Sequence, residues 1–256
     1  MLAFAIRLYN GGEFSFRPFL LELFFVQNYL GGVYLHTWSL AVEEHFYMLL
    51  MLCFALFFVK QVKHVVPVCI FFIVAPLLLR ISSCFFGDCN NHFYTHTRID
   101  SLFTGVLLCY GWRYHREKLL TLRKNGGYAL LICCLLFLAC FGFMQSYSYF
   151  TQTIGFTLIA LFFAFILLFS LGTEMKSNVP VKVLSFIGFY SYSIYLAHIP
   201  VKWLLEYYGI EEIAGITNLV YFALYITASV TSGVLFSELV ELPILRLRDK
   251  LLPSKA

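Results

Sequence analysis

Residues 36–59 read HTWSLAVEEHFYMLLMLCFALFFV, and this stretch decides the fold. Two adjacent carboxylates, Glu43 and Glu44, and the imidazole of His45 stand at the head of an apolar run that is long enough to cross a bilayer. A charge at that depth persists only where it faces a protein interior or a wet cavity. The stretch therefore predicts a membrane helix with a functional group near its beginning.

The composition extends this prediction to the whole chain. Of the 256 residues, 61% are hydrophobic and 12% are charged, and the mean hydropathy is +0.81, which is far more apolar than an ordinary globular domain. Seven windows have the length and apolarity of a membrane span: 38–59, 65–81, 98–112, 127–144, 151–171, 183–204 and 217–240. An eighth window, 18–35, contains several polar residues and a glycine pair, and it fits a re-entrant or interfacial segment equally well. We expect an all-α, polytopic transmembrane helical bundle of about seven to eight spans, forming one domain over residues 1–256.

The orientation follows from the positions of Lys and Arg, because short basic loops stay cytoplasmic. Thirteen of the eighteen Lys and Arg residues fall in four clusters, at 60–63, 113–124, 176–182 and 246–255. The intervening loops 82–97, 145–150 and 205–216 contain none. The pattern predicts a cytoplasmic C-terminus. The net charge of +4 then reflects topology and attraction to anionic membrane lipids, and it gives no reason to expect a nucleic-acid partner.

The cysteines and histidines suggest neither a metal site nor a bound cofactor. Most cysteines lie in apolar windows, where a thiol acts as a small hydrophobic group. Cys84 and Cys89 share a predicted outer loop and are able to form a short disulfide in an oxidising compartment. The histidines are scattered without zinc-ligand spacing, and the chain contains no glycine-rich phosphate-binding motif.

The first polar constellation lies at the start of the quoted stretch. In a helix, Ser39, Glu43 and Tyr47 share one face, whereas Glu44 points elsewhere. The indole of Trp38, just above them, suits the membrane interface. We therefore expect Glu43 to be the functional carboxylate. The alternative is that both glutamates lie in the wet interfacial zone or bond to a neighbouring helix.

The second constellation is residues 95–101, THTRIDS. Thr97 and Asp100 have the spacing of a capping box, which would explain the aspartate without a function. Arg98 is harder to explain, because a cation near a helix N-terminus opposes the helix dipole and needs an anionic partner. That partner is either a carboxylate such as Glu43 or a substrate.

The third constellation is a polar row in the window 183–204. Ser191, Tyr195 and His198 share one helical face, and Pro200 removes a backbone hydrogen bond beside His198, which predicts a kink with a spare carbonyl. His198 is either a packed core histidine or an acid–base group.

Two glutamates, Glu238 and Glu241, lie near the end of the last window. They are expected to pair with Arg246 or Arg248, close to Pro243.

The predicted topology brings Glu43, Arg98 and His198 to a similar depth on the non-cytoplasmic side. Each begins or occupies the outer half of a different predicted helix. We therefore expect them to line one polar cavity that opens outward.

At these same residues the sequence resembles the membrane acyltransferase-3 family, which includes bacterial O-antigen and exopolysaccharide O-acetylases. Four segments carry the resemblance in order: 38–47 (WSLAVEEHFY), 97–105 (TRIDSLFTG), 191–200 (SYSIYLAHIP) and 241–243 (ELP). Each segment alone is weak evidence of the resemblance, whereas the four segments in order make it specific. Family members open with a helix that carries an Arg and, eleven positions later, a His. Here Arg7 is followed at that distance by Pro18, so we expect the chain to be missing N-terminal helices or to be a degenerate member.

The resemblance implies transfer of an acyl group, commonly acetyl, from acyl-CoA to a hydroxyl of an extracytoplasmic glycan or lipid-linked sugar, in the bacterial inner membrane. The expected catalytic residues are Glu43, Arg98 and His198; the expected substrate contacts are Trp38, Ser39, Tyr47, Asp100 and Tyr195; and the expected structural residues are Pro200, Glu241 and Pro243. Two alternatives remain. One is a transporter with a Glu/Arg/His relay, and the other is an inactive, truncated acyltransferase homologue.

Overall fold

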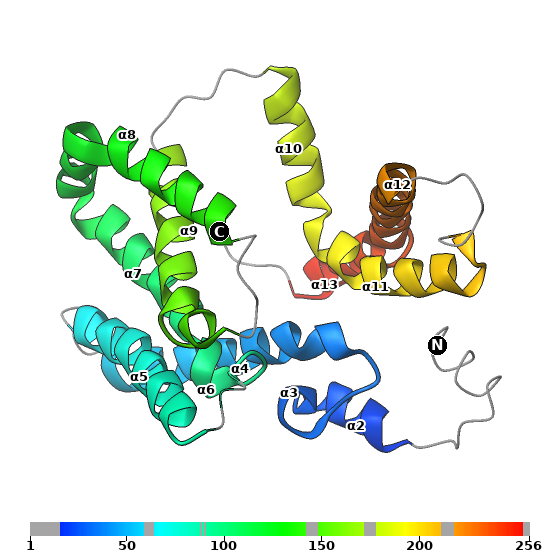
Figure 1. The fold of residues 1–256 in the computed structure, drawn as a ribbon, viewed down its shortest axis with the longest axis horizontal. Helices are drawn as coiled ribbons and strands as arrows, with labels where there is room; N and C mark the ends of the chain where they lie inside the picture. Colours follow the sequence, from blue (N-terminus) through cyan, green and yellow to red (C-terminus); the bar gives the residue numbers. More distant parts are fainter. Residues whose placement is uncertain are drawn as a thin grey trace. The chain divides into compact units, whose positions relative to one another are not determined.

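The computed structural model describes residues 16–58, 64–87, 89, 91–141, 148–171, 178–210 and 218–252. Regular structure in this part of the chain is entirely helical, which confirms the all-α prediction there (Figure 1). The chain divides into two compact units, one formed by residues 16–173 and the other by residues 1–15 together with 174–256. Each unit is described by itself.

The first unit contains most of the helices. They are α2 (Arg17–Leu23), α3 (Gln27–Leu30), α4 (Trp38–Cys53), α5 (Val65–Phe85), α6 (Thr95–Arg98), α7 (Asp100–Tyr114), α8 (Arg116–Phe141) and α9 (Phe156–Ser170). A π-helical turn, Phe54–Phe58, prolongs α4, and another, Thr151–Gly155, precedes α9. Helix α7 packs against both α5 and α9, so it is central to this unit.

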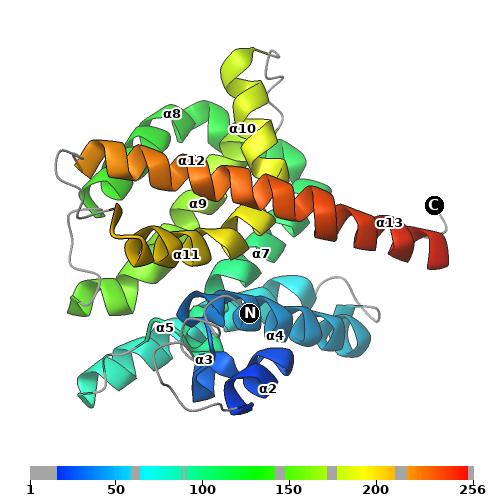
Figure 2. The same ribbon diagram turned by 90° about the vertical axis from the view of Figure 1, so that its right-hand side faces the viewer.

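The second unit contains α10 (Val179–Phe189), α11 (Ser191–Tyr207), α12 (Asn218–Phe236) and α13 (Leu242–Leu251). A π-helical turn, Ser237–Glu241, joins α12 to α13, and Figure 2 shows the two helices following each other as one long rod. Helices α11 and α12 approach closely at Gly233, where an added Cβ would lie 2.5 Å from the Cα of Ile194. Only a glycine allows this approach.

Four helical stretches of the described chain are long and apolar enough to cross a membrane: Trp38–Phe57, Val65–Phe85, Thr151–Ser170 and Asn218–Leu251. The pair α10 and α11 makes a fifth if it counts as one span. These stretches are those of a multi-pass membrane protein, but the predicted seven to eight spans are not confirmed.

The missing spans have particular reasons. The window 98–112 forms α7, whose 15 residues reach only about 22 Å, less than the roughly 30 Å hydrocarbon layer. The window 127–144 falls partly outside the described residues. The window 18–35 forms the two short helices α2 and α3, so it is not one spanning helix.

The window 183–204 is broken at a place that the sequence did not indicate. Helices α10 and α11 meet at Tyr190 with a bend of 72°. Pro200 lies inside α11, which continues through it to Tyr207. The bend at Tyr190 was not predicted, and the kink expected at Pro200 stays a prediction.

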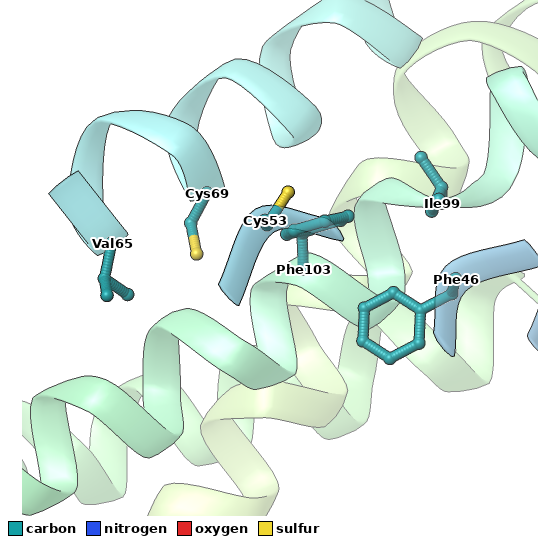
Figure 3. Packing of buried hydrophobic residues seen from close by; sticks show 6 residues of the cluster. All are labelled: Phe46, Cys53, Val65, Cys69, Ile99 and Phe103. Atoms are coloured by element: carbon teal, nitrogen blue, oxygen red, sulfur yellow. The ribbon is translucent and has the colours of Figure 1, made fainter. Parts of the chain in front are cut away.

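The apolar core of the first unit lies where α4, α5 and α7 meet. Figure 3 shows its buried members, Phe46, Cys53, Val65, Cys69, Ile99 and Phe103. The Phe103 ring stacks on Phe72 with 4.4 Å between centroids and meets Phe46 edge to face at 5.3 Å. Many other large apolar side chains of these helices are exposed, as expected for surfaces that face lipid.

Cys84 and Cys89 form a disulfide just after α5. The loop between them turns at Gly87, whose φ of +93° favours glycine. The bridge fixes the end of α5 to the loop that leads to α6 and α7.

Candidate functional site

Arg98 is the last residue of α6, immediately before α7 begins at Asp100. Its guanidinium carbon lies 3.9 Å from the centroid of the Phe156 ring and 5.6 Å from that of Trp38. Aromatic faces attract a cation in this geometry. The ion pairs within the described part of the chain involve neither Arg98 nor Glu43, so the Glu43–Arg98 pair considered above is not formed.

Beside Arg98 lies a buried ion pair between α5 and α7. The Nη2 atom of Arg80 is 2.8 Å from Oδ2 of Asp100, and the two side chains are 0% and 2% exposed. Thr157 of α9 also donates to this oxygen, at 2.9 Å. Arg80 further donates through Nε to the carbonyl of Thr153, at 2.9 Å, and through Nη1 to the carbonyl of Thr97. One guanidinium thus joins α5 to α6, to α7 and to the π-helical turn before α9.

This network explains why a carboxylate is present at position 100, and the predicted capping box is not needed to explain it. The N-cap position of α7 is Ile99, and Thr97 donates to the carbonyls of Asn91 and Tyr94 instead, each at 2.9 Å. The capping-box prediction was therefore wrong. Asp100 is the buried counter-ion of Arg80.

A second layer of polar groups supports the ion pair. Asn91 accepts a hydrogen bond from Ser83 at 2.8 Å, and its backbone N–H donates to the side-chain oxygen of Gln152 at 3.0 Å. Asn91 and Gln152 are both buried, and Gln152 lies in the π-helical turn before α9. Single π-helical turns occur frequently at functional sites. Here the turn directs the Thr153 carbonyl toward Arg80.

Histidines and aromatic rings surround the Arg98 end of these helices. His92 lies between Trp38 and Phe156, with ring centroids 5.1 and 5.7 Å away. Burial, and then the charge of Arg98, lowers the pKa of His92. Burial also lowers the pKa of His96, whose Nδ1 lies 3.0 Å from the hydroxyl of Tyr29. Both imidazoles therefore favour the neutral form.

A third imidazole, His45, joins α4 to this region. Its Nδ1 lies 2.7 Å from the hydroxyl of Thr95, which also accepts a hydrogen bond from Asn28 at 2.8 Å. His45, His92 and His96 were not among the predicted site residues. No group of three or more His, Cys, Asp or Glu side chains in the described residues is arranged to hold a metal ion.

The predicted residues of α4 divide into two groups. Trp38 contacts Arg98 and His92, so it belongs to the site. Glu43 and Ser39 are both half-buried. Tyr47 is 51% exposed and packs beside Phe46. The structure therefore places Trp38 with Arg98, and it leaves the carboxylate of Glu43 outside the ion-pair network.

The second unit holds the other predicted residues. In α11, the Nδ1 atom of His198 contacts the backbone carbonyl of Tyr195, and the two rings lie 5.3 Å apart. The convergence of His198 with Glu43 and Arg98 stays a prediction, because they belong to different units.

The glutamates at the end of α12 have other partners than those expected. Glu241 accepts hydrogen bonds from Ser193 and Ser237, and Glu238 accepts one from Tyr190 at 2.6 Å. The predicted pairing with Arg246 or Arg248 was wrong, and Arg248 pairs with Asp249. Glu241 thereby links α11 to the end of α12, and the structural role expected of Glu241 and Pro243 stays a prediction.

A pocket of about 260 Å³ extends along α7 and α9 from this cluster of charged groups. Arg98 and Asp100 line one end. The remaining lining consists of Ser101, Gly105 and Leu108 from α7 and of Phe156, Ile159, Ala160, Phe163, Ala164 and Leu167 from α9. The arrangement combines a cation with a long apolar surface.

Sequence reasoning missed Arg80, the most connected side chain of the site. The available signal was a single charge near the end of an otherwise apolar window, 65–81, which is a functional candidate in a membrane protein. Asn91 and Gln152 carried no such signal, because isolated amides are common in loops and at helix ends.

Several helices are apolar and long enough to span a membrane, which defines the class as a multi-pass membrane protein. In the first unit, a buried ionic network forms a polar site at the ends of such helices. A family model described as an acyltransferase domain matches residues 2–238. The chain belongs to the acyltransferase 3 family, which confirms the resemblance seen in its motifs. No curated protein and no solved structure matches the chain.

Proposed function

We propose that the protein is an integral membrane O-acyltransferase that moves an acyl group, commonly acetyl, from acyl-CoA to a hydroxyl of an extracytoplasmic saccharide. The observation that carries this proposal is the Arg98 guanidinium, which lies between aromatic rings, forms no ion pair within the described residues and lines a pocket in a chain of the acyltransferase 3 family. Such a cation is available to an anionic part of a substrate.

The chemistry requires a base, an acid and a means of holding the substrates. The saccharide hydroxyl oxygen attacks the thioester carbonyl carbon while a base removes the hydroxyl proton; the carbon–sulfur bond then breaks, and the CoA thiolate takes up a proton. We assign the base to Glu43, which lies outside the ion pairs of the described residues. We assign the second proton transfer to His198, while Arg98 holds an anionic substrate group.

The other residues expected at the site are assigned supporting roles. We propose that Trp38, Ser39, Tyr47 and Tyr195 contact the substrates. Asp100 acts through Arg80 and Arg98 by fixing the start of α7. The disulfide between Cys84 and Cys89 supports an oxidising, non-cytoplasmic side for the end of α5. We propose a bacterial inner membrane with a cytoplasmic C-terminus, which rests on the basic clusters of the sequence.

The test uses bacterial membranes that contain the chain and acetyl-CoA labelled in the acetyl group. The label recovered in the membrane glycan and glycolipid fraction measures transfer. Glu43→Gln and His198→Ala should each lower the rate about 100-fold or more, because general acid–base groups contribute about 10²- to 10⁴-fold. The matched control is Glu44→Gln, which makes the same change at the neighbouring carboxylate and should retain transfer. Wild-type rates in both test variants would contradict the assignment.

A further inference from the structure

We propose that the pocket along α7 and α9 binds the hydrocarbon chain of a single-chain lipid phosphate, and that Arg98 holds its phosphate group. This inference rests on the proposed function, because it identifies this lipid as the carrier of the acceptor saccharide. Binding of such a lipid to this chain can be measured without the acyl-transfer reaction.

The pocket has two ends of opposite character. Arg98 and Asp100 line one end, whereas beyond them the walls are apolar: Gly105, Leu108, Ala160, Phe163, Ala164 and Leu167. Phe163 and Leu167 are exposed, so the apolar part is open on its side rather than enclosed. A lateral opening of this kind admits a hydrocarbon chain from the surrounding lipid. The volume of the pocket, about 260 Å³, is below the 300–1,000 Å³ of typical pockets for compact ligands.

The length of the pocket matches one leaflet of a membrane. Its α9 wall runs from Phe156 to Leu167, which is twelve residues separated by eleven rises, or about 16 Å along a helix. The hydrocarbon core of a bilayer is about 30 Å thick, so the apolar wall covers about half of it. A lipid whose head lies at Arg98 would therefore place its chain along this wall within one leaflet.

The charged end carries an excess positive charge. Asp100 is compensated by Arg80 at 2.8 Å, and its Oδ2 atom also accepts a hydrogen bond from Thr157. Two guanidinium groups therefore share one carboxylate: Arg80 forms the ion pair with Asp100, and Arg98, which also feels the charge of Asp100, forms no ion pair within the described residues. A phosphate provides oxygens for the planar donor set of arginine.

The same end of the bundle identifies the leaflet. The loop after α5 leads through the Cys84–Cys89 disulfide to α6 and Arg98. Because disulfides persist in oxidising compartments, this end faces away from the cytoplasm. The phosphates of acyl-CoA arrive from the cytoplasm, on the side of the membrane opposite to Arg98. The geometry thus favours a carrier lipid of the outer leaflet over the acyl chain of the donor.

Gly105 provides a way to close the pocket without disturbing the fold. It lines the pocket, and an added Cβ would meet no atom within 4 Å. A leucine there would occupy the space for the chain. Gly188 of α10 also has open space around it and does not line the pocket, so the same substitution there is a matched control.

The experiment measures binding of dodecyl phosphate to the purified full chain in a mild uncharged detergent, by native mass spectrometry across a titration. Inorganic phosphate and dodecyl maltoside serve as the head-only and tail-only comparisons. We expect one dodecyl phosphate per chain, bound at least about tenfold more tightly than either comparison ligand. Arg98→Gln should weaken binding about 10- to 100-fold, as expected for the loss of a charge-assisted contact. Gly105→Leu should weaken it about tenfold or more, and Gly188→Leu should not change it.

The outcomes separate the proposals. Equal binding to wild type, Arg98→Gln and Gly105→Leu would overturn the site. Inorganic phosphate that binds as tightly as dodecyl phosphate would show a free-anion site and would overturn the role of the chain. If the acetyl-transfer assay fails while dodecyl phosphate binds as expected, the lipid site stands and the proposed activity falls. If transfer is retained and Gly105→Leu affects neither binding nor transfer, the lipid site falls alone.

Discussion

Asp100→Asn is the substitution that most directly tests the buried network. It is nearly isosteric and removes the negative charge that faces Arg80 at 2.8 Å, where the two side chains are 0% and 2% exposed. Removing one partner of a buried pair leaves an uncompensated buried charge and costs about 3–5 kcal/mol. For a protein of this size, each kcal/mol lowers the melting temperature by about 2–4 °C. We therefore expect Asp100→Asn to lower it by about 6–20 °C.

Two further substitutions calibrate this result. Thr157→Val removes the hydrogen bond that Thr157 donates to the same carboxylate and the one that it accepts from Arg80. The ion pair itself stays, so this variant should cost about 1.5–3 kcal/mol, less than the loss of the charge. Glu206→Gln makes the same chemical change in the exposed pair Lys202–Glu206, whose side chains are 50% and 40% exposed. Exposed pairs contribute about 0–1 kcal/mol, so that variant should melt close to wild type.

The assay is thermal unfolding of purified protein in detergent, followed by far-ultraviolet circular dichroism at one scan rate. The expected order of melting temperatures is wild type and Glu206→Gln, then Thr157→Val, then Asp100→Asn. A melting temperature for Asp100→Asn within about 2 °C of Glu206→Gln would refute the reasoning, because a buried guanidinium cannot lose its counter-ion at so small a cost.

Three other predictions concern packing, topology and pH. Gly233→Ala should destabilise the protein by about 1–3 kcal/mol, because its Cβ would meet backbone of the neighbouring helix, whereas Gly188→Ala meets open space and should not, as melting curves would show. With the disulfide cysteines replaced by serine, Phe86→Cys should react with an impermeant thiol reagent in intact cells, and Leu252→Cys only after permeabilisation; the reverse pattern would invert the proposed topology. Because the folded protein holds the pKa of His92 below its usual value, the unfolded chain binds more protons in mildly acidic solution, so the melting temperature should fall as the pH drops from about 7.5 to about 5.5. His92→Gln should reduce that slope, and an unchanged slope would exclude His92 as its source.

The helical class and several spans of the fold followed from apolar length alone. Helix α4 begins at Trp38, where the predicted span began, and Val65–Phe85 and Thr151–Ser170 correspond to two further windows. The window 98–112 has only 15 residues, the same number as α7, so it was too short to be counted as a span. Hydropathy could not show that the helical pair at 179–207 bends at Tyr190, because both sides of the bend are apolar.

The candidate site was predictable only in part, for a physical reason. Arg98 stood out because a cation near a helix N-terminus is locally unfavourable, and it is indeed next to the pocket. Arg80 did not stand out, because its partners Asp100 and Thr157 lie 20 and 77 residues away. The local spacing of Thr97 and Asp100 suggested a capping box. Asp100 instead pairs with the more distant Arg80, because a buried guanidinium requires a buried carboxylate.

The twenty residues that separate Arg80 from Asp100 have a consequence for biogenesis. During synthesis, α5 reaches the translocon with a bare arginine, and an arginine within a membrane helix costs up to about 2.5–3.5 kcal/mol in insertion assays. The neutralising aspartate emerges only with α7. An early release of α5 into lipid is therefore disfavoured until α7, which carries the aspartate, has been translated.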